Sequence, residues 1–72
     1  MTDAKTAVLA MMANRGIKTY TALGDACGLS AQAARGKMIR RHMTFDDVRL
    51  FADGLGFNAD LVITNKITGE EI

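Results

Sequence analysis

Residues 19–38, TYTALGDACGLSAQAARGKM, decide the fold. They contain two short helical stretches that only three residues separate. Gly28 can end the first helix in a left-handed conformation, and the Ser30 hydroxyl can accept hydrogen bonds from free amides at the start of the second. Two helices joined by so short a turn cross at a steep angle. The stretch therefore predicts a helix-turn-helix unit, with helices over about 20–27 and 30–40.

A helix over about 3–15 is predicted before this unit. Thr2 or Asp3 can cap its first turn, because both side chains carry an oxygen that accepts from a free amide. Gly16 is a natural stop for it. One face repeats apolar residues at helical spacing and would lie in the core. That face consists of Ala7, Val8, Met11 and Met12.

A fourth helix is predicted over about 45–55. Its start is well marked, because Thr44 and Asp47 have the spacing of a capping box and acidic side chains favour the positive end of a helix dipole. Gly56 can end it. Its apolar face consists of Val48, Phe51, Ala52 and Leu55.

The last residues change period, from a helical repeat to short apolar runs. Leu61-Val62-Ile63 is followed by Thr68-Gly69, a typical turn pair. We expect strands at about 60–65 and 70–72, which form a C-terminal β-hairpin over about 60–72. The predicted fold is mainly α, with four helices and this short hairpin in a single domain, residues 1–72.

Composition narrows the classes of function that we expect for this chain. The chain has 72 residues, 49% of them hydrophobic and 24% charged, which favours one small folded domain over a disordered segment. Cys27 is the only cysteine and His42 the only histidine, so neither an internal disulfide nor a protein zinc site is expected. Asp46 and Asp47 are explained by helix capping. We expect no enzyme, no cofactor and no metal.

The net charge of +1 hides an asymmetry between the two parts of the chain. Residues 1–42 hold seven basic and two acidic side chains, a balance of +5, whereas residues 43–72 hold two basic and six acidic ones, a balance of −4. Affinity for DNA depends on where positive charge is concentrated, not on the total. The basic part therefore remains compatible with a nucleic-acid partner.

The quoted stretch resembles the helix-turn-helix of the phage lambda repressor and Cro superfamily, also known as XRE-type domains. The run Met43-Thr44-Phe45 through Leu55-Gly56 is similar to the fourth helix of that group, and the resemblance covers roughly residues 5–57. The turn Gly28-Leu29-Ser30-Ala31-Gln32-Ala33 is similar to that of short bacterial, phage or mobile-element regulators. Three residues depart from the family pattern, Gly24, Ala34 and Gly36.

The resemblance implies that the helix beginning near Ser30 lies in the major groove of DNA. Its base-contacting residues would be Ala31, Gln32, Arg35 and Gly36. Gln32 can bond to adenine, Arg35 to guanine, and the Ala31 methyl can touch thymine. The alternative is that Gln32 and Arg35 are ordinary solvated residues. Gly36 either permits a close approach to DNA or is merely tolerated in a helix, where glycine costs about 1 kcal/mol relative to alanine.

The resemblance also implies phosphate contacts on either side of the groove. The candidates are Thr19, Tyr20, Thr21, Ser30, Lys37, Arg40, Arg41 and His42. Amides at a helix start favour an anionic phosphate, and a run of basic side chains can neutralise the phosphates flanking the groove. The alternatives stay open: Tyr20 can cover the edge of the core, and a charge run is often only a solvated face.

Two hypotheses of function follow. In the first, the chain is a sequence-specific DNA-binding regulator, a repressor that acts by occupying its site. It would work as a homodimer formed through the hairpin or the fourth helix, because one small domain contacts little DNA. We expect it in the cytoplasm, near the nucleoid, without membrane attachment, since no apolar run spans a bilayer. In the second, it is an adaptor or antitoxin-like interaction module that keeps this scaffold without reading DNA.

Overall fold

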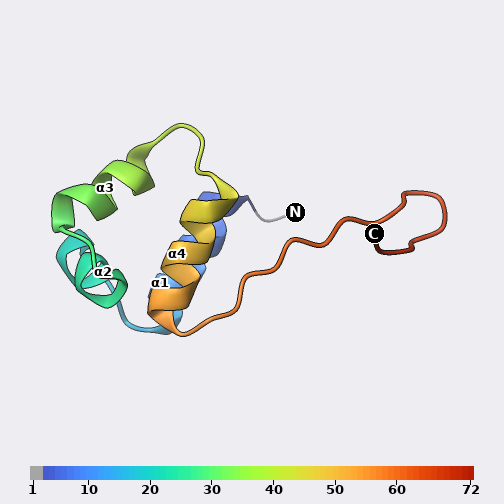
Figure 1. Ribbon diagram of the computed structural model, residues 1–72. Helices are drawn as coiled ribbons and strands as arrows, with labels where there is room; N and C mark the ends of the chain where they lie inside the picture. The colour runs from blue at the N-terminus through green and yellow to red at the C-terminus, as the bar shows by residue number, and fades with distance from the viewer. Residues whose placement is uncertain (1–2) are drawn as a thin grey trace.

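The computed structural model describes residues 3–72 and is mainly helical. Four helices follow one another, α1 (Ala4–Asn14), α2 (Tyr20–Cys27), α3 (Ala31–Ile39) and α4 (Phe45–Leu55) (Figure 1). Helix α1 packs against α4, while α2 packs against both α3 and α4. The four helices agree with the helical part of the expectation drawn from the sequence.

Each helix begins at a side chain that bonds a free amide of the first turn. Four such caps are present, and the capping box predicted for α4 is confirmed because Asp47 also accepts from the Thr44 amide. Asp3 caps α1, whereas the alternative cap, Thr2, lies outside the described residues. The bonds run from Thr6 N to Asp3 (2.8 Å), Ala22 N to Thr19 (3.1 Å), Ala33 N to Ser30 (3.0 Å) and Asp47 N to Thr44 (3.1 Å).

The core lies where the four helices meet. Phe51, Leu23 and Val8 are its largest fully buried side chains, and they come from α4, α2 and α1. Helix α3 contributes Ala34 and Met38, on the side opposite its exposed residues. The remaining buried members of the cluster are Met12 and Leu55. Every helix is therefore fixed through at least one buried side chain, α3 included.

The turn between α2 and α3 depends on two glycines. Gly28 ends α2 with a φ of 71°, a left-handed conformation that glycine adopts without steric penalty. Gly24 lies where the turn folds back on α2, and a Cβ built on it would lie 2.5 Å from the carbonyl oxygen of Leu29. The missing side chain lets the turn approach α2 closely, so the position of α3 is fixed by backbone contact.

Arg15 joins the far ends of α1 and α4. Its Nε donates to the carbonyl oxygen of Leu55 at 2.8 Å, and its guanidinium carbon lies 4.4 Å from the centre of the Phe57 ring. The last carbonyls of a helix lack partners within the helix, and a guanidinium satisfies them well. Arg15 therefore stabilises the side-by-side packing of α1 on α4.

The expected C-terminal β-hairpin is wrong. Residues 60–65 and 70–72 form no strands; the only ladder contact among residues 3–72 is one isolated antiparallel bridge between Thr64 and Glu71. The turn itself is present, because the Asn65 carboxamide oxygen accepts from the Ile67 and Thr68 amides at 2.8 and 3.3 Å. Residues 60–72, called the tail below, extend away from the helices (Figure 1). No buried residue lies in the tail to hold longer segments together.

Candidate nucleic-acid interface

Helix α3 presents a face that the rest of the protein does not cover. Gln32 and Arg35 are exposed, and residues three apart are neighbours on one helix face. Within residues 3–72, neither side chain takes part in a hydrogen bond or an ion pair. Ala31 and Gly36 are half-buried beside them. The two long polar side chains can therefore reach an external partner without breaking an internal contact.

Gly36 borders open space at the surface of α3. A Cβ built there meets no atom within 4 Å, in contrast to the close contacts at Gly24. The fold therefore does not require glycine at this position. The sequence allowed two interpretations of Gly36: it permits a close approach by a partner, or it is merely tolerated in the helix. An open surface is compatible with both.

Lys37 lies on the other side of α3, toward the start of α4. Its ammonium group is 2.7 Å from the Asp47 carboxylate, and the Arg40 guanidinium is 3.7 Å from the same carboxylate. Asp47 is buried, with 6% of its surface exposed. The hydrogen bond from Lys37, opposed by burial and supported by bonds from Thr44, holds the pKa of Asp47 below its usual value. Lys37 and Arg40 thus tie α3 to α4, whatever contacts they make with a ligand.

A groove lined mainly by basic side chains, called the basic groove below, is formed by the residues directly after α3 and by the start of α1. It has a volume of about 500 Å³ and lies between the first turn of α1 and the loop into α4. Three of the predicted phosphate-contacting residues line it, and Lys5 joins them from α1. No local sequence pattern points to Lys5, because it lies 35 or more positions from the others along the chain. The lining consists of Asp3, Ala4, Lys5, Arg40, Arg41, His42 and Met43.

The remaining candidates lie at the starts of α2 and α3. The Thr19 and Ser30 hydroxyls cap these helices, and each accepts a hydrogen bond from a backbone amide. Each hydroxyl hydrogen therefore remains free to donate to a ligand. Tyr20 is 39% exposed and Thr21 is exposed. Tyr20 is not a member of the buried core cluster, and a partly exposed ring is compatible both with a phosphate contact and with a cover at the edge of the core.

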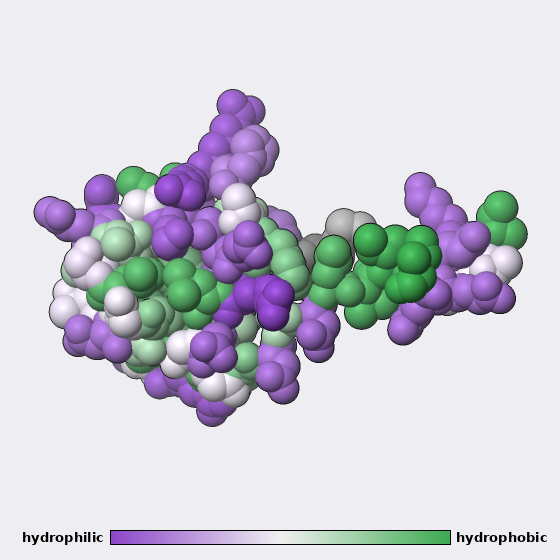
Figure 2. Space-filling view, in the orientation of Figure 1, coloured by the Kyte–Doolittle hydropathy of each residue, from purple (hydrophilic) through white to green (hydrophobic). Residues whose placement is uncertain are grey.

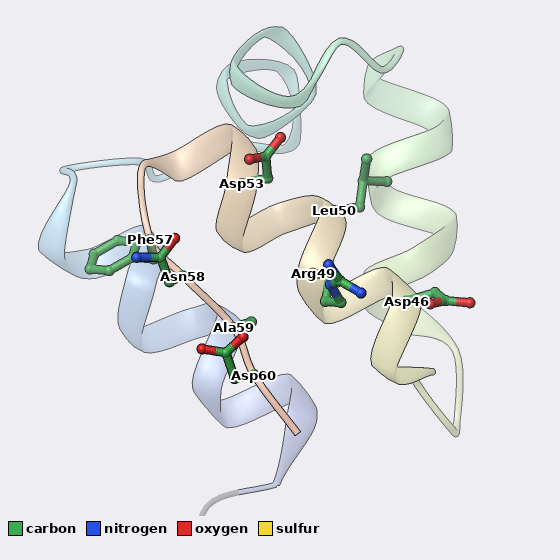
Figure 3. Close-up of a pocket in the computed structure, with 8 residues that line it drawn as sticks. All are labelled: Asp46, Arg49, Leu50, Asp53, Phe57, Asn58, Ala59 and Asp60. Carbon is green, nitrogen blue, oxygen red and sulfur yellow. The ribbon is translucent and has the colours of Figure 1, made fainter. Parts of the chain in front are cut away.

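A second hollow lies on the acidic side, between α4 and the residues after it. It has a volume of about 600 Å³ and is lined by Asp46, Arg49, Leu50, Asp53, Phe57, Asn58, Ala59 and Asp60. Figure 3 shows that the Asp46, Asp53 and Asp60 carboxylates point in different directions. Three carboxylates against one guanidinium disfavour a phosphate, and carboxylates that do not converge do not form an acid–base pair.

The remaining side chains that could take part in catalysis or metal binding have structural explanations. Cys27 packs against the core from α2, and burial, with a smaller contribution from Asp53, raises the pKa of its thiol. A raised pKa disfavours the nucleophilic thiolate. Among residues 3–72, no three His, Cys, Asp or Glu side chains are placed to hold a metal ion.

Comparisons of the chain with protein-family models, with curated proteins and with solved structures give no match. None of the helices formed by residues 3–72 has both the length and the apolar character needed to cross a bilayer.

Proposed function

We propose that the protein binds double-stranded DNA with α3 in the major groove and acts as a small transcriptional regulator by occupying its site. The observation that carries this proposal is the pair Gln32 and Arg35, exposed, uncommitted and adjacent on a helix that backbone contacts hold in place. A guanidinium can bond both acceptors of guanine and a carboxamide both edge groups of adenine. In a helix fixed before binding, only these side chains and not the backbone have to be ordered on binding.

The charge distribution supports the same orientation. The basic groove adds Lys5, Arg40, Arg41 and His42 beside α3, while the acidic hollow lies along α4. Phosphates on one side of the major groove would meet the basic groove, and the acidic side would face away from the DNA. As the resemblance implies, we propose that the protein has this role in the cytoplasm of a bacterium, on nucleoid or phage DNA.

Selection of the pure protein on a pool of random duplexes, followed by sequencing, tests the proposal. We expect an enriched motif. On the best site, Arg35→Ala should weaken binding by about 1–3 kcal/mol and relax the preference at one base position. Arg41→Ala should weaken binding to all duplexes nearly alike, since a phosphate contact carries no sequence information.

Arg49→Ala is the matched control, because it removes the same charge from the acidic hollow. Its affinity for DNA should equal that of the wild-type protein. Equal losses for Arg35→Ala and Arg49→Ala would contradict the assignment of α3 as the reading helix, since the loss would then follow only the net charge.

The dependence of affinity on salt separates this proposal from an interaction module that does not read DNA. Each phosphate contact releases counterions, so several contacts give a steep fall of log K with log salt concentration. A flat dependence, or no enriched motif together with no retention of duplexes, would favour the adaptor or antitoxin-like alternative. The exposed apolar tail is the observation that keeps this alternative in view.

A further inference from the structure

The surface away from α3 has two features that contact with DNA does not explain, the tail and the acidic hollow. The tail exposes three consecutive apolar side chains, called the apolar run below: Leu61, Val62 and Ile63 are 67%, 59% and 52% exposed. Figure 2 shows an apolar surface lying apart from the helical body. Soluble proteins seldom expose contiguous apolar surface of this kind unless it meets a partner.

The backbone of the tail also has an open edge. The Ile63 carbonyl and the Asn65 amide are bonded to residues 70–72, at 2.9 and 2.8 Å. Since successive residues of an extended segment direct their backbone groups to opposite sides, Val62 and Thr64 face outward. Neither of them makes a backbone hydrogen bond within the described part of the chain. An open edge of this kind is a template for pairing with another strand.

The acidic hollow lies at one end of this edge. Asn58, Ala59 and Asp60 line the hollow and lead directly into the apolar run. Among the residues that the structure describes, residues 58–62 make no backbone hydrogen bond. A strand added along residues 58–64 would therefore reach from the hollow to the apolar run.

The charge of the hollow favours a basic segment. Three carboxylates, from Asp46, Asp53 and Asp60, stand against one guanidinium, from Arg49. Figure 3 shows that these carboxylates point in different directions, so they fit cations spaced along a peptide better than a single ion. The half-buried Leu50 gives the hollow an apolar wall, on which the aliphatic stem of a lysine or arginine can lie.

A second copy of this chain fits the same surface poorly. The tail carries one basic side chain, Lys66, against three acidic ones, Asp60, Glu70 and Glu71. Pairing of two tails would bring an acidic segment to an acidic hollow, whereas a basic segment of another protein is attracted there. The homodimer expected from the sequence is therefore not the occupant that the charges favour.

We propose that residues 58–64 bind an extended segment of a different protein as an added strand, with lysine or arginine side chains of that segment in the acidic hollow and its apolar side chains against the apolar run. In strand addition, backbone hydrogen bonds supply affinity and the side chains supply specificity. The tail extends away from α3 (Figure 1), so the partner leaves α3 accessible. The contact is smaller than a standard interface, and we expect a dissociation constant in the micromolar range.

A phage-displayed library of random peptides, selected on the immobilised full chain, tests the proposal. We expect enrichment of peptides in which lysine or arginine residues adjoin a stretch of alternating apolar residues. An enriched peptide, synthesised with a fluorescent label, then gives a dissociation constant by fluorescence anisotropy in the absence of DNA. Its affinity should fall as the salt concentration rises, because salt screens charges in an open hollow.

Two pairs of variants locate the bound peptide. Asp60→Lys reverses a charge in the hollow and should weaken binding by about three- to tenfold, whereas Asp25→Lys makes the same change at an exposed residue of α2 and should leave it nearly unchanged. Val62→Pro removes an amide of the outward edge and should weaken binding by a similar factor. Leu61→Pro is its control, because by the same alternation the Leu61 amide faces the opposite side.

Several outcomes would overturn the proposal: no enriched peptide, enrichment of acidic peptides, or equal losses for the two members of either pair. Formation of a wild-type dimer in sedimentation equilibrium that Val62→Pro abolishes would also overturn it, since the edge would then hold a second copy. Thermal unfolding followed by circular dichroism should be the same for all these variants, because none of the residues belongs to the core. Arg35→Ala should bind the peptide like the wild-type protein, so this proposal and the one on DNA binding can fail separately.

Discussion

Asp47 shows how one side chain can carry both a local and a long-range role. Its Oδ2 accepts from the Thr44 amide at 3.4 Å within the capping box, and its Oδ1 accepts from Lys37 at 2.7 Å. The first contact follows from a spacing of three residues and was predicted. The second joins α3 to α4 and depends on how the helices pack, which the spacing of the sequence does not reveal.

The ion pair makes the stability of the protein depend on pH. A carboxyl whose pKa is lowered in the folded state stabilises it above the unfolded pKa, about 3.9, and loses this effect as pH falls through the folded value. We expect Asp47→Asn to reduce the free energy of unfolding by about 1–2 kcal/mol at pH 7 and by less near pH 3. Urea unfolding followed by circular dichroism at both pH values measures this.

Asp46→Asn is the control, since Asp46 is the exposed neighbour in the same helical turn. It should change the stability little and leave the pH profile intact. Asp3 also has a lowered pKa, because the Thr6 amide bonds it, so some acid sensitivity should persist in both variants. Identical pH profiles for Asp46→Asn and Asp47→Asn would contradict the role given to the ion pair.

Whether a helix or a strand could be predicted from the sequence depended on how far apart in the chain its contacting residues lie. The helix starts are fixed by caps within three residues. Ser30 and Thr44 were identified as caps from the sequence, and Asp3 was one of two candidates for α1. The hairpin was predicted from alternation and a turn pair. Strands also need sustained pairing and a surface to pack on, and the tail has one bridge and no core contact.

The close contact of Gly54 with α2 was not anticipated. A Cβ built on Gly54 would lie 2.5 Å from the Cys27 sulfur and 2.8 Å from the Cys27 Cα, so the glycine lets α4 approach α2. Nothing in the neighbouring residues distinguishes it from a glycine that is merely tolerated. Gly24, in contrast, was singled out in the sequence because it departs from the family pattern.

The helix-turn-helix unit allows a test with one substitution at two glycines. Gly24→Ala would force the turn away from α2 and should destabilise the protein by about 1–3 kcal/mol. Gly36→Ala enters open space in a helix and should stabilise it by about 0.5–1 kcal/mol. Urea unfolding of both variants measures the difference. If Gly24→Ala proved as stable as the wild-type protein, the close approach of the turn to α2 would be refuted.

The whole molecule consists of a helical body and a projecting tail, and its extents are 44 × 23 × 18 Å. The core lies entirely in the body, together with the basic groove and the exposed face of α3. The charge asymmetry read from the sequence corresponds to a spatial one, with the basic groove and the acidic hollow lined by different segments. Folding of the body should therefore not depend on the tail.

Hydrogen exchange of backbone amides, measured by NMR, checks this independence. In dilute protein, the amides of Leu61 and Val62 should exchange at nearly unprotected rates, because no backbone carbonyl among residues 3–72 accepts from them. The Leu23 amide, bonded to Thr19 within the body, should exchange far more slowly. Equal protection of the tail and body amides in dilute protein would show that the two unfold as one unit.

The extended backbone between Asn58 and Ile63 has a consequence for how the chain is degraded. Proteases bind their substrates as extended strands, and this segment already has that form. Within residues 3–72, residues 58–62 make no backbone hydrogen bond. A single cleavage here would remove the tail and leave α1 to α4 joined. We therefore expect proteolysis to remove the tail before it degrades the helical body.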